Sequence, residues 1–158
     1  MTDIFSLKVE ELSAKIKDSQ LTSVEICKKY IERIKEFEKD VKAWAHFDKK
    51  LLLEKAAEAD DYRRSGKPLG PLHGIPVALK DIVGTVDMPT ECGTVIRKGK
   101  SYSQNAEIVD LLLASGAIIM GKTATSELAY LGPSKTTNPH DHSRTPGGSS
   151  SGSAASVA

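Results

Sequence analysis

The 158-residue chain is poor in the residues that mark several specialised classes of protein. Its two cysteines, Cys27 and Cys92, are far apart in the sequence and form no CxxC pair. A disulfide framework and a structural zinc site are therefore not expected, and the cysteine usage fits a reducing compartment such as the cytoplasm. No sequence pattern predicts a cofactor.

The chain also lacks an excess of charge of either sign, and it has no long hydrophobic runs. The chain has 22 basic and 21 acidic residues, which gives a formal net charge of +1. This balance gives no sign of a nucleic-acid or membrane partner. The N-terminus lacks the basic start and the apolar run of a signal peptide, and no apolar stretch is long enough to cross a membrane.

What is present is the composition of a folded domain. Hydrophobic residues make up 39% and charged residues 27%, and the length is that of about one domain. Apolar residues at helical spacing predict helices over residues 7–17, 22–39, 49–64 and 105–115. Thr22 and Glu25 form a capping box at the start of the second helix. Asp48 caps the third helix, which ends at Gly66, and Gly116 ends the fourth.

Short apolar segments between these helices predict strands. They cover residues 41–47, 77–84 and 117–120, and a turn at 121–123 and a short helical piece over 126–130 follow. Helices that alternate with short apolar strands indicate an α/β fold with a covered sheet. At Lys67 the sequence becomes rich in Pro and Gly. We therefore expect a helical region over about residues 1–66 and a second region over about 67–158.

Residues 116–123, Gly-Ala-Ile-Ile-Met-Gly-Lys-Thr, satisfy the pattern of a phosphate-binding loop. That loop needs a strand before it, a flexible turn around the phosphate and a helix directly after it. Here a helix precedes the pattern, and its four middle residues are apolar and typical of a strand. We interpret the segment as a helix end, a buried strand and a turn, and a nucleotide-binding module stays a remote alternative.

The histidines give weaker signals. His140 and His142 could begin a metal site, but no third ligand pattern accompanies them, and residues 139–142 are typical of a polar turn. No metal site is therefore predicted. His73 lies just before a predicted strand, where packing or positioning is expected, and His46 is expected on a strand surface.

The most informative segment is Pro-Gly-Gly-Ser-Ser-Ser-Gly-Ser-Ala-Ala-Ser-Val, residues 146–157. Its composition is typical of a flexible linker. Against that interpretation, specific turn residues precede it and small helix formers end it. A glycine turn at a helix start directs backbone N–H groups and serine hydroxyls into one small volume. Such a place suits a reaction in which negative charge develops on oxygen.

Lys80 is the natural chemical partner of these serines. It lies near the end of a predicted apolar strand, where partial removal from water favours a neutral amine. A neutral lysine is a base, and Ser–Lys combinations are variants of the Ser–His–Asp arrangement. The alternative is a surface lysine paired with Asp81, and spacing alone favours that alternative.

Four segments in order carry a resemblance to a known family. They are Gly-Pro-Leu-His-Gly-Ile-Pro-Val-Ala-Leu-Lys-Asp at 70–81, the 116–123 segment, Asn138-Pro139, and the Gly-Ser segment that starts at Pro146. Over essentially the whole chain, the sequence resembles the amidase signature family. The resemblance implies a mixed β-sheet covered by helices and hydrolysis of a small-molecule amide through a Ser-cisSer-Lys triad. No cofactor or metal is implied.

Two branches of that family stay open. The motifs resemble free-standing amidases of the malonamidase type, for which a homodimer is one expectation. The near relative is the A-type subunit of a glutamyl-tRNA(Gln) or aspartyl-tRNA(Asn) amidotransferase, which releases ammonia from glutamine and works with partner subunits.

The resemblance also implies roles for individual residues. Lys80 matches the base, and Ser149 matches the bridging serine, which follows a cis peptide bond. Gly147, Gly148, Ser150 and Ser151 are the neighbours expected to line the site. The nucleophilic serine belongs to a further Gly-Gly-Ser motif that is not found before Ala158. We therefore expect an incomplete amidase-signature domain, an N-terminal fragment that is inactive by itself and leaves apolar faces uncovered.

Overall fold

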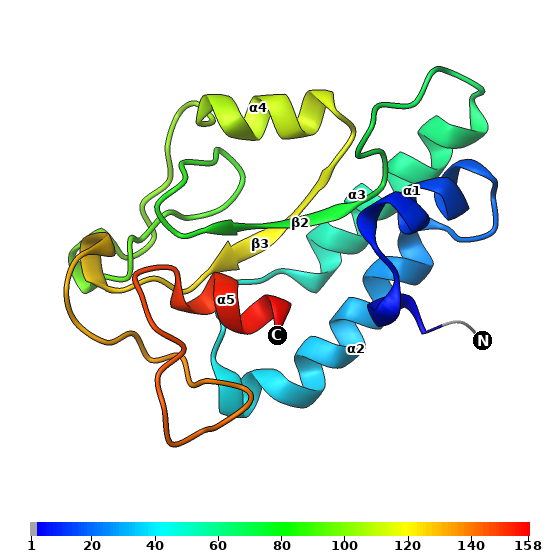
Figure 1. Cartoon of the computed structure of the whole chain (residues 1–158). Helices are drawn as coiled ribbons and strands as arrows, with labels where there is room; N and C mark the ends of the chain where they lie inside the picture. The colour runs from blue at the N-terminus through cyan, green and yellow to red at the C-terminus, as the bar shows by residue number, and fades with distance from the viewer. Residues whose placement is uncertain (1–2) are drawn as a thin grey trace.

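The chain folds around a small mixed sheet, which the computed structural model describes within residues 3–158 (Figure 1). The strands are β1 (Trp44–His46), β2 (Pro76–Lys80) and β3 (Ile118–Thr123), and their order in the sheet is β1-β3-β2. β1 runs antiparallel to β3, and β2 runs parallel to it. The predicted α/β class with a mixed, covered sheet is therefore confirmed.

The N-terminal part begins with helices. It contains a short 3-10 turn, η1 (Ile4–Ser6), followed by α1 (Val9–Lys17) and α2 (Ser23–Val41). The predicted capping box starts α2: Thr22 Oγ1 accepts the Glu25 N–H at 3.1 Å, and the Glu25 carboxylate accepts the Thr22 N–H at 2.8 Å. Hydrogen bonds from Thr22, first from its side chain and then from its backbone, lower the pKa of Glu25.

A second cap on α2 comes from α3 (Lys49–Arg64). The buried carboxylate of Asp60 accepts the N–H groups of Ser23 at 2.8 Å and of Val24 at 3.1 Å. These are amides that the first turn of a helix leaves without partners inside the helix. Asp60 therefore fixes α3 against the start of α2, a contact that sequence spacing could not reveal.

The first strand is shorter than predicted, because α2 continues through Val41. Lys42 then adopts a left-handed conformation with φ of 55°, and the Glu38 carboxylate accepts the N–H groups of Ala43 and Trp44. This polar cap turns the chain from the helix into β1. The alternation of apolar and polar residues over 41–47 therefore covers the end of α2 and the strand β1, and not one continuous strand.

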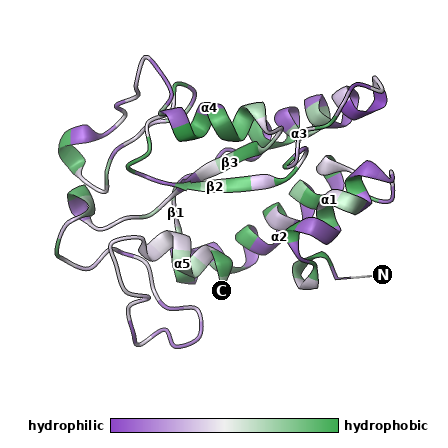
Figure 2. Ribbon diagram, turned by 45° about the horizontal axis from the view of Figure 1, so that its top comes forward, coloured by the Kyte–Doolittle hydropathy of each residue, from purple (hydrophilic) through white to green (hydrophobic). Residues whose placement is uncertain are grey.

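β2 and β3 are joined through α4 (Glu107–Ala114), the crossover that a parallel pair requires. One apolar cluster packs α4 on the sheet and contains Leu79, Met88, Val109 and Ile119. The opposite cluster joins α2, α3 and β1 to the other face of β3 through Cys27, Leu52, Ala56, Trp44, Ile118 and Met120. Figure 2 shows α4 on one side of the strands and α2 and α5 on the other.

The predicted turn at residues 121–123 is wrong, since β3 continues through Thr123 and residues 118–123 are all buried. The register against β2 shifts between Val77 and Ala78, which pair with Ile119 and Gly121. Met120 is therefore an extra residue, and such a bulge changes which face the following side chains take. A Cβ at Gly121 would lie 2.7 Å from the His46 carbonyl oxygen, so the close approach of β1 requires glycine there.

The C-terminal Gly-Ser segment ends in a helix, α5 (Ser151–Val157). Its Gly152 N–H donates to the Ala124 carbonyl at 2.9 Å, and Ala155 is buried in the cluster with α2 and α3. A Cβ at Gly152 would lie 2.3 Å from Ala124 N and from Ala43 O, so only glycine permits this contact. The segment packs on the sheet, and the flexible-linker interpretation is wrong.

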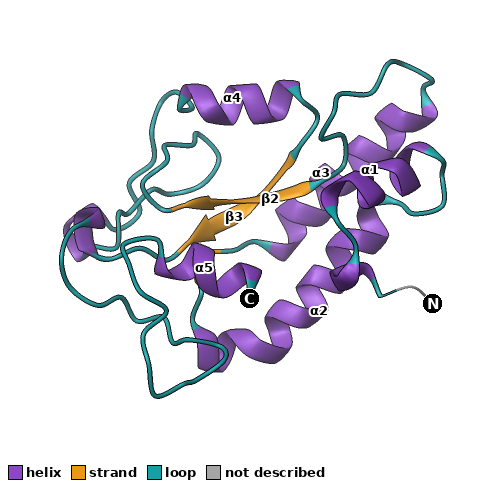
Figure 3. Ribbon diagram, viewed as in Figure 1, coloured by secondary structure: helices purple, strands orange, loops and turns teal. Residues whose placement is uncertain are grey.

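Long irregular segments join these elements (Figure 3). They carry two 3-10 turns, η2 (Val95–Arg97) and η3 (Glu127–Ala129), the second within the predicted helical piece. Large apolar side chains at least 75% exposed lie on these segments and on α5: Val95, Ile96, Tyr130, Leu131 and Val157. This exposure agrees with the expected uncovered apolar faces. Within residues 3–158, no helix is both long and apolar enough to cross a membrane.

Candidate functional site

Lys80 and Ser149 meet beside the carboxyl end of β2. Lys80 is the last residue of that strand, and Ser149 lies just before α5. A hydrogen bond of 2.6 Å joins Lys80 Nζ to Ser149 Oγ, and both residues are half-buried. The structure therefore brings together the two predicted site residues. An amine and a hydroxyl at this distance can exchange a proton directly.

The backbone of Ser149 is held by the segment that follows β3. The Gly148–Ser149 peptide bond is cis, as the resemblance implied. The Ser149 carbonyl accepts two hydrogen bonds, from Thr125 Oγ1 at 3.0 Å and from Ser126 N at 3.1 Å. Thr125 and Ser126 are buried, and sequence reasoning missed both as supports of the site. The only signal was a pair of hydroxyl residues directly after a buried apolar strand.

The other residues expected to line the site fall into two groups. Gly147, Gly148 and Ser150 are exposed next to Ser149, and Gly147 has φ of 88°, which favours glycine. Ser151 instead is buried, and its Oγ bonds Ser134 Oγ at 2.5 Å. The Ser151 hydroxyl thus fixes the start of α5, whereas the other three remain open to a ligand.

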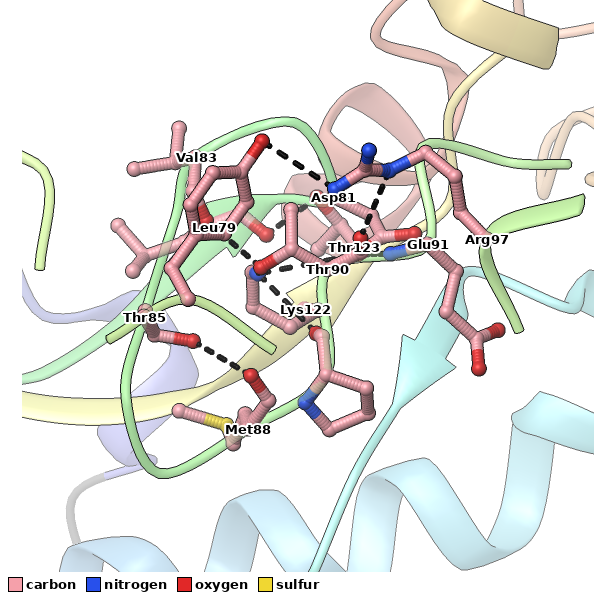
Figure 4. A network of polar contacts seen from close by, with 12 residues as sticks. Leu79, Asp81, Val83, Thr85, Met88, Thr90, Glu91, Arg97, Lys122 and Thr123 are labelled. Atoms are coloured by element: carbon pink, nitrogen blue, oxygen red, sulfur yellow. Dashed lines mark hydrogen bonds and ion pairs between the residues drawn. The ribbon is translucent and has the colours of Figure 1, made fainter. Parts of the chain in front are cut away.

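A second lysine, Lys122, lies on β3, the strand adjacent to β2, and Figure 4 shows its polar contacts. Its side chain is fully buried, and Nζ donates to Thr90 Oγ1 at 2.6 Å and to the Pro89 carbonyl at 3.2 Å. The same nitrogen lies 3.7 Å from Asp81 Oδ1. The ammonium group therefore makes two hydrogen bonds and one ion pair. The alternative that paired Asp81 with Lys80 is therefore wrong, because the ion pair of Asp81 is with Lys122.

Burial dominates the electrostatics of that ion pair. It raises the pKa of Asp81, against hydrogen bonds from the backbone N–H of Glu91 and the charge of Lys122, which lower it. It lowers the pKa of Lys122, against the charge of Asp81. Each ion therefore depends on the other to stay charged in this environment.

The burial of Lys122 also decides whether residues 116–123 form a phosphate-binding loop. Gly121, Lys122 and Thr123 belong to β3 and are buried, and no helix begins within the residues that follow up to 126. A phosphate-binding lysine must face a ligand from a loop that precedes a helix. The interpretation of residues 116–120 as a helix end and a buried strand is confirmed, and the pattern has no structural basis for phosphate binding.

The histidines lie away from Lys80 and Ser149. His140 is exposed in the turn closed by the Asn138–Asp141 bridge, and His142 is exposed directly after it. Across residues 3–158 no group of three metal-ligating side chains occurs. His73 is buried, and its Nε2 lies 3.0 Å from the Ala59 carbonyl, so it packs as predicted. His46 is half-buried on β1.

Comparison with known proteins gives a consistent result. The family model described as Amidase matches residues 25–158. The A-type subunit of the glutamyl-tRNA(Gln) amidotransferase of Chloroflexus aurantiacus is 39% identical over 164 residues, which cover 100% of this chain and 34% of the relative. Its counterpart in Thermobifida fusca is also 39% identical, over 166 residues, with 100% and 33% covered. The chain thus spans about a third of the length of these relatives.

Solved structures agree in fold. The peptide amidase of Stenotrophomonas maltophilia has 34% sequence identity and a TM-score of 0.87, over 94% of this chain and 33% of that enzyme. A fatty acid amide hydrolase has 29% identity and a TM-score of 0.87, over 94% and 27% of the two chains. With the lysine and serine already adjacent at the end of β2, these matches leave one conclusion: the chain belongs to the amidase family.

Proposed function

We propose that this chain supplies the lysine and the bridging serine of an active centre that hydrolyses carbon–nitrogen amide bonds. The 2.6 Å hydrogen bond between Lys80 Nζ and Ser149 Oγ carries the proposal. Membership of the amidase family and the likeness to enzymes named peptide amidase and fatty acid amide hydrolase support it. The proposed substrate is a small-molecule amide. Because the chain spans about a third of its relatives, the activity is that of the whole protein that carries it.

In the proposed reaction, Lys80 acts as the base in its neutral form. The nucleophilic serine, expected in a further Gly-Gly-Ser motif of the whole protein, gives its proton to Ser149 while Ser149 gives its own to Lys80. The serine oxygen bonds to the amide carbon. When the carbon–nitrogen bond breaks, the leaving nitrogen takes a proton from Ser149, and Lys80 returns one to Ser149. Water releases the acyl group through the same relay.

Substitution of the two residues in the whole protein tests this proposal. We expect Lys80→Ala to lower kcat for amide hydrolysis by about 10⁴-fold and Ser149→Ala by about 10²- to 10³-fold. Release of ammonia or amine reports the rate, and Lys98→Ala, at an exposed lysine on the surface, is the matched control. Near-normal kcat in either site variant would remove both residues from the mechanism.

The second candidate function is that of the A-type component of an amidotransferase. The names of the two bacterial relatives favour it. Under this alternative, ammonia released from glutamine passes to partner subunits. Glutamine-dependent ammonia release only after co-expression with such subunits would support it, whereas hydrolysis of simple amides by the protein alone, as a monomer or homodimer, would support the free-standing amidase.

We propose that residues 1–158 form the N-terminal part of a larger amidase domain, with a helical region over about 1–66 and the beginning of the catalytic core over about 67–158. The positions of Lys80 and Ser149 in the second region support this division. The unpaired Cys27 and Cys92 support a cytoplasmic protein. Limited proteolysis of the whole protein tests the division, which predicts that no cut within 67–158 is tolerated without loss of activity.

A further inference from the structure

Lys80 and Ser149 come from elements that are distant in the sequence, so something must hold those elements in register. Lys80 ends β2, and Ser149 lies at the start of α5. Their hydrogen bond joins two half-buried partners and cannot by itself fix the geometry that fast proton transfer needs. A buried link between β2 and α5 is therefore needed to hold Lys80 and Ser149 in place.

Thr123 has the required position. It is the Cα partner of Lys80 in the parallel pair of β2 and β3, and its side chain is fully buried. Thr123 Oγ1 donates to the Leu79 carbonyl at 3.3 Å, in the residue directly before Lys80. The same oxygen lies 2.7 Å from Ser153 Oγ in α5. Figure 4 labels Thr123 with its partner Leu79 on the neighbouring strand.

The directions of these hydrogen bonds follow from the number of hydrogens. Thr123 has one hydroxyl hydrogen, and the contact with the Leu79 carbonyl uses it, because a carbonyl only accepts. Ser153 must then donate to Thr123. In the order Ser153 to Thr123 to Leu79, each hydroxyl hydrogen is donated to the next acceptor, and the chain of hydrogen bonds links α5 to β2.

We propose that Thr123 is a positioning residue for the Lys80–Ser149 pair, which rests on the function proposed above. Its hydroxyl ties the carbonyl before Lys80 to the first turn of the helix that follows Ser149. The bulge at Met120 is what turns Thr123 toward α5, since strict alternation after Ile118 would face it to the other side of the sheet. Its hydroxyl bonds Leu79 and Ser153 and neither Lys80 nor Ser149, so it acts only through the separation of Lys80 and Ser149.

The test compares variants that keep or remove the hydroxyl. Thr123→Val removes it and keeps the β-branched shape, so we expect kcat of the whole protein to fall by about 10- to 100-fold while KM stays within about twofold. Thr123→Ser keeps the hydroxyl and should recover most of the lost kcat. Ser153→Ala cuts only the link to α5 and should also lower kcat, whereas Ser156→Ala, on the exposed side of the same helix, is the control.

Two measurements, kcat and the distance between Lys80 Nζ and Ser149 Oγ, make the outcomes distinct. Lys80→Ala is assayed in parallel, and an inactive wild-type protein would refute the proposed function and not the geometry. A crystal structure of Thr123→Val then tests the geometry without activity: the distance between Lys80 Nζ and Ser149 Oγ should exceed the 2.6 Å of the parent. Unchanged kcat or an unchanged distance in a folded Thr123→Val variant would overturn the inference. If that variant does not fold, Ser153→Ala decides by the same two measurements.

Discussion

The two lysines at the end of the sheet occupy opposite environments. Lys80 and Lys122 lie on adjacent parallel strands, with Lys80 beside Thr123 and Lys122 beside Leu79. Lys80 is half-exposed and has a neutral hydroxyl as its partner. Lys122 is fully buried and has a carboxylate, a hydroxyl and a carbonyl around it. One lysine therefore has a hydroxyl partner and access to solvent, and the other is enclosed next to a carboxylate.

This difference shows why only one of two neighbouring lysines is a candidate base. A lysine in the interior is tolerated because Asp81 and the segment over 88–94 provide its amine with polar partners. The Asp81 carboxylate in turn accepts the N–H groups of Glu91 and Gly93, and these hydrogen bonds hold it away from Lys80. Lys80 is therefore left without an anionic partner among residues 3–158, and its side-chain hydrogen bond is to the Ser149 hydroxyl.

Removal of the two amines gives the largest contrast. We expect Lys122→Met to lower the free energy of unfolding by about 3–5 kcal/mol, because the variant leaves Asp81 buried without its cation. Lys80→Met should cost about 1 kcal/mol or less, since Lys80 is half-exposed and loses one hydrogen bond. Urea unfolding of the whole protein measures both values. Equal losses would mean that the two environments differ less than their burial indicates.

The pH dependence of the free energy of unfolding gives a second test of the Lys122→Met variant. Burial raises the pKa of Asp81 above its ordinary value. A raised folded-state pKa contributes stability below the unfolded pKa and loses it as the pH rises through the folded one. Without Lys122 the carboxyl group is more easily protonated, so the Lys122→Met deficit should be smaller at pH 5 than at pH 8.

Replacing both partners separates charge from packing. The variant Asp81→Asn with Lys122→Met has no unpaired buried ion, so it should regain about 1–3 kcal/mol over Lys122→Met alone. The amide oxygen of Asn can still accept one of the two backbone N–H groups, of Glu91 and Gly93, that the Asp81 carboxylate accepts. A double variant no more stable than the single one would mean that Lys122 contributes mainly through its packed aliphatic stem.

The sequence predicted the positions of the helices and strands better than the face of the sheet that each side chain takes. The Thr22–Glu25 capping box, the helix ending at Arg64 and the adjacency of Lys80 and Ser149 followed from local spacing or from the resemblance. The continuation of β3 through Thr123 was missed because Gly-Lys-Thr is typical of a turn, and its burial depends on Asp81 and Thr90, which are distant in sequence. The bulge at Met120, which exchanges the faces that Lys122 and Thr123 would take under strict alternation, has no local signature.

The reactivity of the two cysteines shows how well each face of the sheet is protected from solvent. We expect this to be the smallest of the predicted effects. Cys27 lies in the core between α2, α3 and β3, and burial raises its pKa to about 12. Cys92 lies half-exposed on the segment that covers Lys122. At pH 8, iodoacetamide should therefore alkylate Cys92 and leave Cys27 unmodified in the native protein, as peptide mass spectrometry would report.

The raised pKa of Cys27 also fixes the sign of a stability change. Its contribution is present below the unfolded value near 9 and is lost as the pH rises toward about 12. Stability should therefore fall over that interval, and a Cys27→Ala variant, though less stable at pH 8, should show a flatter decline. Alkylation of Cys27 as fast as that of Cys92 would contradict the contrast, because it would show that the face beneath Lys80 opens as readily as the segment over Lys122.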